Sequence, residues 1–239
     1  MRQRWNDLLF AHWPVPPDLL DGRLPAGLEV DRYDGAAWLG VVPFTMDRVQ
    51  SRVAGSRTLG VPGARAFPEL NLRTYVRSRR TGLAGVYFFS LDAGSLLAVL
   101  GARIFFHLPY FWARMRAERL AGGAVRYSSA RHLRRERAAF AADFRGSGEP
   151  RRSAPGSIEA FLTDRYCLFT QGRSGSLLVG HIHHLPWPLE PAEAEFSRND
   201  LAAANRLALP RDTAPLLHFA RELEVYIWPL RPDHPPPPA

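Results

Sequence analysis

The chain has 239 residues, of which 46% are hydrophobic and 23% are charged, and its formal net charge is +8. A chain of this length and composition can bury a full core, so we expect one domain over residues 1–230 and a proline-rich, disordered tail at residues 231–239. The single cysteine, Cys167, excludes an internal disulfide, and its apolar neighbours favour a core position over a nucleophilic one.

All 31 basic residues are arginine, and lysine is absent. A Schiff base requires a primary amine, which a guanidinium group does not replace, so no side chain of this protein can form an imine with a ketone. The N-terminal segment lacks the cleavage pattern of a secretory signal. Arg103 and His107 interrupt the longest apolar stretch, which falls short of the ~18 uninterrupted apolar residues of a membrane span. We therefore expect a cytoplasmic protein that does not cross a membrane.

The predicted elements of the first half begin with a short helix started by Pro17 and Asp18. They continue with a hairpin around a turn at 33–35, a polar connection over 47–66, a pair of strands at 67–78 and 82–94, and a helix at about 94–106. The helical spacing of apolar residues such as Val99 and Ile104 predicts that this helix is buried. Pro109 ends it.

The second half consists mainly of predicted strands. We expect a strand at 122–133, an element at 132–145 that fits helix and strand equally, a loop at 146–157, a helix capped by Ser157, a hairpin formed by 166–170 and 177–187, and a last strand at 217–230. The predicted elements are many strands, one buried helix and a few short helices. This combination predicts an α+β fold in which a large antiparallel sheet, or a closed barrel, surrounds one central buried helix.

A row of polar residues lies within the predicted strand 67–78. Because side chains alternate along a strand, Glu69, Asn71, Arg73 and Tyr75 share one face. This face is either solvated or lines an enclosed pocket. The neighbouring strand is apolar on both faces until Ser90, which favours the pocket. Glu69 and Arg73 could pair with each other, with Arg73 free to bind a carboxylate and Glu69 to act as an acid or base.

Other candidate sites are weaker. His181 and His183 share a strand face, but no third ligand has a diagnostic spacing, so packing histidines are preferred to a metal site. Arginine clusters such as 77–80 and 131–137 could hold phosphates, yet no nucleic-acid motif accompanies them, and nucleic acid is disfavoured. There is neither a P-loop nor a dinucleotide fingerprint, and we expect no cofactor.

Nearly the whole chain, from about residue 3 to 229, resembles the DUF2071 (YqjF-like) family. The motifs that carry the resemblance are long, and they include "LLDGRLPAGLEVDRYDGAAWLGVVPFTM", "FPELNLRTYV", "ARIFFHLPYFWARM" and "GSIEAFLTDRYCLF". The family has no assigned activity to carry over.

That family is in turn similar to acetoacetate decarboxylase. "FPELN" resembles the catalytic-glutamate segment of that enzyme and would place Glu69 at the glutamate. "AVLGARIFFHLPYFWARM" resembles its helix and the Tyr-Pro-Lys-Lys motif that follows, with Pro109 at the proline and Tyr110 where the nucleophilic lysine stands. The resemblance would make Arg4 the counterpart of its N-terminal arginine. The resemblance implies a cone-like antiparallel barrel with an internal pocket, crossed by the strand that carries Glu69.

Tyr110 cannot form an imine, so decarboxylation through a Schiff base is excluded. We expect a pocket for a small anionic organic molecule of the keto- or hydroxy-acid type. Arg73, Asn71, Tyr75 and Arg4 would bind it, and Glu69 and Tyr110 would supply any acid–base chemistry of the lyase, hydratase or isomerase kind. The alternatives are a non-catalytic ligand-binding module and a structural or nucleic-acid-interacting protein. A homo-oligomer is left open.

Overall fold

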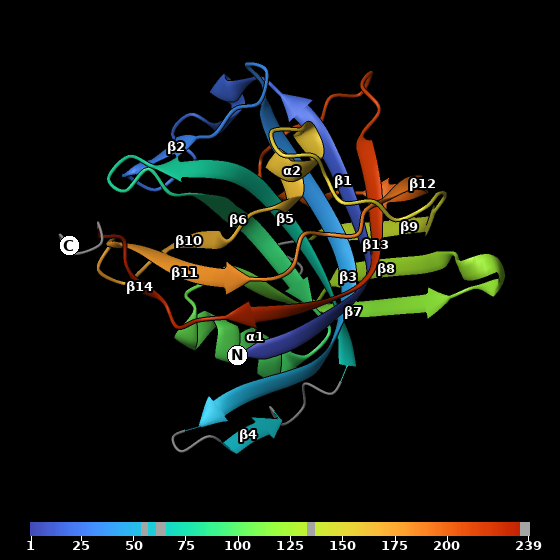
Figure 1. The fold of residues 1–239 in the computed structure, drawn as a ribbon, viewed down its shortest axis with the longest axis horizontal. Coiled ribbons are helices and arrows are strands. Elements are labelled where there is room, and N and C mark those ends of the chain that lie inside the picture. Colours follow the sequence, from blue (N-terminus) through green and yellow to red (C-terminus); the bar gives the residue numbers. More distant parts are fainter. Residues whose placement is uncertain (54–56, 61–65, 133–136, 235–239) are drawn as a thin grey trace.

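Strands dominate the computed structural model of the protein, which describes residues 1–53, 57–60, 66–132 and 137–234 (Figure 1). Within these residues, fourteen strands belong to one sheet. The strands are β1 (Arg2–Val15), β2 (Leu28–Val30), β3 (Ala37–Val53), β4 (Arg57–Gly60), β5 (Ala66–Ser78), β6 (Ala84–Ala93), β7 (Tyr110–Arg119), β8 (Val125–Arg131), β9 (Ala139–Gly146), β10 (Cys167–Gln171), β11 (Leu177–His183), β12 (Glu190–Asn199), β13 (Leu216–Ile227) and β14 (Arg231–Pro232).

The sheet curls back on itself. Its neighbouring strands run in the order β14-β11-β10-β6-β7-β8-β9-β12-β13-β1-β3-β5-β2, and further pairings join β5 to β6 and β11 to β13. β6 therefore has β5 on one side and both β10 and β7 on the other. The pairings β10–β6 and β6–β7 are parallel, so the sheet is mixed rather than antiparallel as expected. The sequence could not indicate this because β7 itself was not predicted.

Two apolar cores lie on opposite faces of the β1–β3–β5 segment. The inner core lies between this segment and β10, β11 and β13, and includes Phe10, Phe44, Tyr75, Leu91, Tyr110 and Trp187. The outer core lies between this segment and β7, β8, β9 and β12, and includes Leu9, Leu39, Leu70, Leu72, Tyr127 and Phe144. Alternation along β5 thus sends one row of side chains into each core.

The helices are few and short: η1 (Pro17–Leu20), α1 (Leu96–Phe105), η2 (Ala121–Gly123), α2 (Ile158–Thr163) and α3 (Leu201–Ala204). The predicted cap of α2 is confirmed, because the Ser157 hydroxyl accepts a hydrogen bond from the Ala160 N–H at 3.3 Å. No helix in the described part of the chain is long and apolar enough to cross a membrane.

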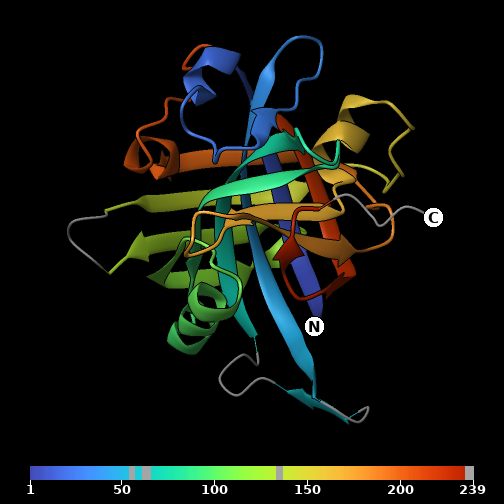
Figure 2. The ribbon, with the colours of Figure 1, turned by 90° about the vertical axis from the view of Figure 1, so that its left-hand side faces the viewer.

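The predicted central buried helix is wrong in position, although its bounds are close. α1 lies on the outside of the sheet in both views (Figures 1 and 2), and only Val99 of its residues is buried. Leu97, Ile104 and Phe105 are 58%, 53% and 73% exposed. Their spacing fits a helix equally well whichever way it faces, so periodicity predicted the element and could not predict what covers it.

Several other expectations need correction. The predicted turn at 33–35 forms, with a bridge between Tyr33 and Ala36. The strands on either side of it do not make a hairpin, since β2 pairs with β5, its Leu28 opposite Ser78. The predicted connection at 47–66 contains the end of β3 and its partner β4, and its remaining parts, 54–56 and 61–65, lie outside the described residues. The ambiguous element at 132–145 is the strand β9 from Ala139, while 133–136 lie outside the described residues, as do 235–239 of the predicted tail. The hairpin β10–β11 and the last strand, β13, are confirmed.

Candidate functional site

The polar row of β5 faces the inner core. β5 pairs with β3 along one edge and with β6 along the other. A bulge in β6 shifts the register between the partners of Leu72 and Arg73, but the alternation of β5 itself is unbroken. Leu70 and Leu72 belong to the outer core and Tyr75 to the inner one. The four predicted side chains are therefore brought together inside the protein rather than on a solvated face.

Both faces of β5 are buried along the polar row. Leu70, Leu72 and Thr74 on the outer-core face are 0% exposed, and Glu69, Asn71, Arg73 and Tyr75 on the inner face are 4%, 4%, 8% and 0% exposed. The polar row is therefore enclosed by the protein.

Glu69 is held by Tyr110, which donates a hydrogen bond of 2.8 Å to the Glu69 Oε2. Burial raises the pKa of the Glu69 carboxyl from 4.5 to about 8, and the bond from Tyr110 opposes this rise. Glu69 is thus mostly protonated at pH 7. Burial, with the nearby Glu69 charge, raises the pKa of Tyr110 well above its ordinary value, so Tyr110 remains a neutral donor.

Tyr110 owes its position to the turn between α1 and β7. Proline at 109 cannot continue a helix, and Tyr110 begins β7 opposite Leu91 of β6. The Arg103 Nε of α1 donates to the Tyr110 carbonyl at 2.6 Å. These contacts fix the backbone from which the Tyr110 ring reaches Glu69.

Arg73 lies in a separate cluster at the other end of the row. Its guanidinium donates to the Tyr75 hydroxyl at 3.2 Å and to the Leu162 carbonyl of α2 at 3.1 Å. The Tyr75 hydroxyl also lies 2.6 Å from the His12 Nε2. Among the described residues, no carboxylate pairs with Arg73, which is only 8% exposed. The predicted pairing of Glu69 with Arg73 is wrong, because each finds other partners.

His12 is a member of this cluster that the sequence did not indicate. It is 0% exposed, and burial, with the charge of Arg73, lowers its pKa well below 6.5, so it is neutral. Gly40 of β3 makes room for it, since a Cβ at Gly40 would lie 2.9 Å from the His12 ring. His12 shares one face of β1 with Leu8 and Phe10. This alternation would have indicated a buried His12 if the first residues had been predicted to form a strand.

Arg4 is not brought to the row. A register shift in β1 between Asn6 and Ala11, where Asp7 has a φ of 50°, reverses which face each residue takes. Arg4 therefore points away from the inner core and pairs with Asp47 at 2.6 Å and with Glu222 at 3.4 Å. It is a surface ion-pair residue in this structure.

The histidine and cysteine candidates lie elsewhere. His181 and His183 are exposed on β11, and the described residues hold no group of three or more side chains suited to a metal ion. Cys167 is buried in a small apolar cluster, and burial raises the pKa of its thiol to about 11. A protonated, buried thiol is a poor nucleophile, as the sequence predicted.

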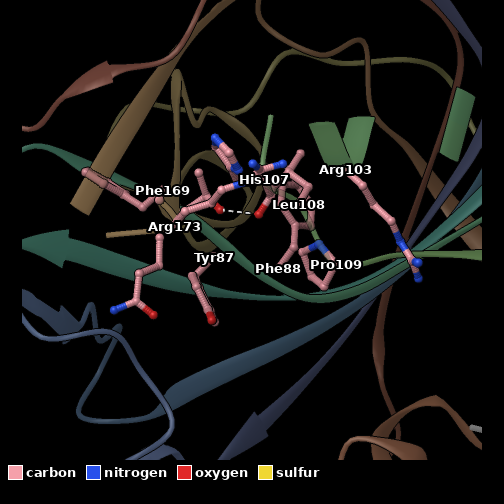
Figure 3. A pocket seen from close by; sticks show the side chains of 11 residues that line it. Tyr87, Phe88, Arg103, His107, Leu108, Pro109, Phe169 and Arg173 are labelled. Atoms are coloured by element: carbon pink, nitrogen blue, oxygen red, sulfur yellow. Dashed lines mark hydrogen bonds between the residues drawn. The ribbon is translucent and has the colours of Figure 1, made fainter. Parts of the chain in front are cut away.

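A cleft of about 340 Å³ opens beside the row rather than on it (Figure 3). It lies where β6 passes from its partner β10 to its partner β7, and Thr170 donates to the His107 carbonyl across it at 2.7 Å. Phe88 and Leu108 line the cleft and also belong to the inner core. Phe88 is also the partner of Arg73 in the β5–β6 pairing, so the cleft lies next to the Arg73 end of the polar row.

The fold is similar to that of acetoacetate decarboxylase-like proteins. The enduracididine biosynthesis enzyme MppR in complex with pyruvate superposes with a TM-score of 0.66 at 15% identity, covering 97% of this chain and 89% of that one. Acetoacetate decarboxylase from Legionella pneumophila gives a TM-score of 0.59 at 14% identity, covering 97% of this chain and 87% of that one.

In sequence, the chain is much more similar to the DUF2071 family than to these structural neighbours. The model of the family DUF2071, described as an uncharacterized conserved protein, matches residues 2–224. The uncharacterized protein YqjF of Bacillus subtilis is 48% identical over 231 residues, which cover 97% of this chain and 91% of YqjF. The chain belongs to the DUF2071 family, as its motifs indicated.

Proposed function

We propose that the inner face of β5 binds a small organic anion of the keto- or hydroxy-acid type through Arg73. The observation that carries the proposal is a guanidinium that is 8% exposed and has no carboxylate partner among the described residues. An unpaired charge is costly to bury, and a ligand carboxylate would relieve that cost with two charge-assisted hydrogen bonds. MppR, which shares the fold, is known in complex with pyruvate, an acid of this class.

Glu69 and Tyr110 would carry the chemistry of the site. A carboxyl with a pKa of about 8 exchanges a proton near neutral pH and is a stronger base than an exposed glutamate. In its ionised form Glu69 takes the proton on the carbon next to the ligand carbonyl, and it returns that proton to the same or a neighbouring carbon. Once Glu69 holds that proton and is neutral, the Tyr110 hydroxyl turns from Glu69 and donates its hydrogen bond to the oxygen on which the enolate charge develops. This sequence is that of an isomerase, or of the first half of a lyase or hydratase, and it needs neither an imine nor a cofactor.

A thermal-shift screen of small keto acids, hydroxy acids and enolisable ketones tests the binding. A ligand at about a hundred times its Kd should raise the Tm by about 5 °C or more. Arg73→Leu should abolish that rise, and Glu69→Gln should keep it. A rise that persists in Arg73→Leu, or its absence with every acid, would refute the proposal.

Deuterium exchange at the carbon next to the ligand carbonyl, followed by NMR, then separates an enzyme from a binding module. An enzyme exchanges that proton in the wild type and loses the exchange in Glu69→Gln while still binding. A binding module shows the same slow exchange in both proteins.

A further inference from the structure

Asn71 is the one member of the polar row for which the structure provides no role. It is 4% exposed, its Oδ1 has no hydrogen-bond partner, and Asn71 donates no hydrogen bond to another described residue. A buried amide oxygen without a partner is destabilising, and such atoms are rare in folded proteins. Asn71 lies midway between Glu69 and Arg73 on the same face of β5, so its unused acceptor is placed within the proposed ligand site.

The two ends of the row are far apart. Four residues of β-strand separate the Cα atoms of Glu69 and Arg73 by about 13 Å, at ~3.3 Å per residue. The Arg73 side chain leans further from Glu69, because its guanidinium bonds the Tyr75 hydroxyl. A hydrogen bond of about 2.9 Å at each end then leaves at least about 7 Å for the ligand to span. At ~1.2 Å per bond of an extended chain, this is about six bonds between the two ligand oxygens.

The groups between the two ends are apolar except for Asn71. Leu91 is paired with Asn71, and Phe88 is paired with Arg73, on the neighbouring strand β6. The ring of Phe10 lies 5.5 Å from the Arg73 guanidinium carbon. A ligand lying along the row would therefore meet apolar side chains over its middle, with one hydrogen-bond acceptor opposite it.

From these observations we infer the class of ligand, an inference that rests on the proposed function. The ligand is an elongated carboxylic acid whose carboxylate binds Arg73 and whose carbonyl lies at Glu69 and Tyr110, about four or five carbon atoms away. Between them it carries one hydrogen-bond donor, a hydroxyl or N–H group, which faces the Asn71 Oδ1. Pyruvate and acetoacetate are too short to contact both ends of the row. Asn71 is thus the specificity-determining residue of the site.

Isothermal titration with four acids tests this inference: pyruvate, acetoacetate, 5-oxohexanoate and 3-hydroxy-5-oxohexanoate. The wild type should bind 5-oxohexanoate at least about tenfold more tightly than pyruvate. The 3-hydroxyl should add about fivefold, which corresponds to one net hydrogen bond. In Asn71→Leu the gain from the hydroxyl should vanish, while the preference for the longer chain remains.

Asn199→Leu is a matched control. Asn199 also has an Oδ1 without a partner, but it ends β12, opposite Phe140 of β9 and away from β5. This variant should bind all four acids as the wild type does. The far-ultraviolet circular dichroism and the Tm of both variants show whether each is folded.

Each outcome has a distinct meaning. If pyruvate binds as tightly as 5-oxohexanoate, or if Asn71→Leu keeps the gain from the hydroxyl, the elongated ligand is overturned while the proposed function stands. If none of the acids binds, or if Arg73→Leu binds them as well as the wild type does, the proposed function itself fails, and the inference fails with it.

Discussion

Two buried arginines of this protein differ in what the fold provides for them. Arg131 of β8 lies 2.7 Å from the Asp92 carboxylate of β6, and the two side chains are 2% and 1% exposed. Ser129 also donates to Asp92, and the Phe111 ring lies 3.9 Å from the Arg131 guanidinium carbon. Arg73, in contrast, donates its hydrogen bonds within the described residues to two neutral oxygens, those of Tyr75 and Leu162.

The difference separates a structural cation from a candidate binding one. At Arg131 the sequence supplies the counter-ion within the fold, so a ligand there would have to compete with Asp92. At Arg73 the nearest carboxyl along the strand, Glu69, is held by Tyr110 and is mostly protonated at pH 7. The protein thus leaves a positive charge without a counter-ion in the same row in which the Glu69 carboxyl is kept mostly neutral.

The largest expected effect follows from the neutral state of Glu69. Its pKa is about 8 in the folded protein and 4.5 ordinarily, so between these values the folded state binds more protons than the unfolded state. The contribution of Glu69 is therefore fully favourable below about pH 4.5, and the free energy of unfolding falls as the pH rises towards 8. The fall amounts to at most about 5 kcal/mol, at 1.36 kcal/mol per pKa unit. Urea unfolding of the wild type and Glu69→Gln between pH 4.5 and 8.5 measures it as the difference between the two proteins.

Tyr110→Phe sharpens this measurement. The hydrogen bond from Tyr110 stabilises the ionised carboxylate, so its removal should raise the pKa of Glu69 further. The pH-dependent loss of stability should then continue to a higher pH than in the wild type. If the free energies of unfolding of the wild type and Glu69→Gln change in parallel with pH, Glu69 is ionised in the folded protein. Arg73 would then have a charged carboxylate in the same row.

The Asp92–Arg131 pair should show the second largest effect. Asp92→Ala leaves Arg131 buried without a counter-ion, which should cost about 3–5 kcal/mol of unfolding free energy. Replacing both residues by leucine should recover most of this loss, because no buried charge remains. A cost of less than about 1 kcal/mol for Asp92→Ala would show that Arg131 does not depend on its carboxylate, and the contrast with Arg73 would disappear.

Arg73→Leu should behave in the opposite way. Without ligand its free energy of unfolding should stay within about 1 kcal/mol of the wild type, because the substitution strands no carboxylate and Tyr75 still donates to the Leu162 carbonyl. Its thermal stability should no longer respond to any acid that stabilises the wild type. Thermal unfolding with and without ligand gives both results, and a ligand-free loss as large as that of Asp92→Ala would make Arg73 a structural residue.

The local part of this architecture could be predicted from the sequence. The alternation of β5 placed Glu69, Asn71, Arg73 and Tyr75 on one face, and the turn residues of 171–176 predicted the β10–β11 hairpin. Both features depend on neighbours in the chain. The family, and through it the position of Glu69 opposite Tyr110, came from resemblance rather than from periodicity.

The remainder depends on contacts between distant segments. β1 was missed because Pro14 and the polar Asn6 and Asp7 interrupt its pattern, and its partner β13 lies about 200 residues away in the chain. His12 was missed with it. The pairing of Glu69 with Arg73 was predicted from their closeness in the sequence, yet the hydrogen-bond partner of Glu69 is Tyr110 of β7, the strand on the far side of β6. The packing of segments that are distant in the sequence decides which face of α1 is buried and which side chain binds the Glu69 carboxyl.

Arg4 provides the smallest effect and a check on the boundary of the site. It pairs with Asp47 and Glu222 on the outer side of β1, where solvent screens the charges. Arg4→Gln should change the Tm by no more than about 2 °C, since a partly exposed ion pair contributes little. It should also leave the ligand-induced rise in Tm unchanged, in contrast to Arg73→Leu. Asp47→Asn, which removes the same pair from its other side, should match it in both respects. A loss of the ligand-induced rise in Arg4→Gln alone would show that this arginine reaches the ligand, and the register shift at Asp7 would then have to rearrange when the ligand binds.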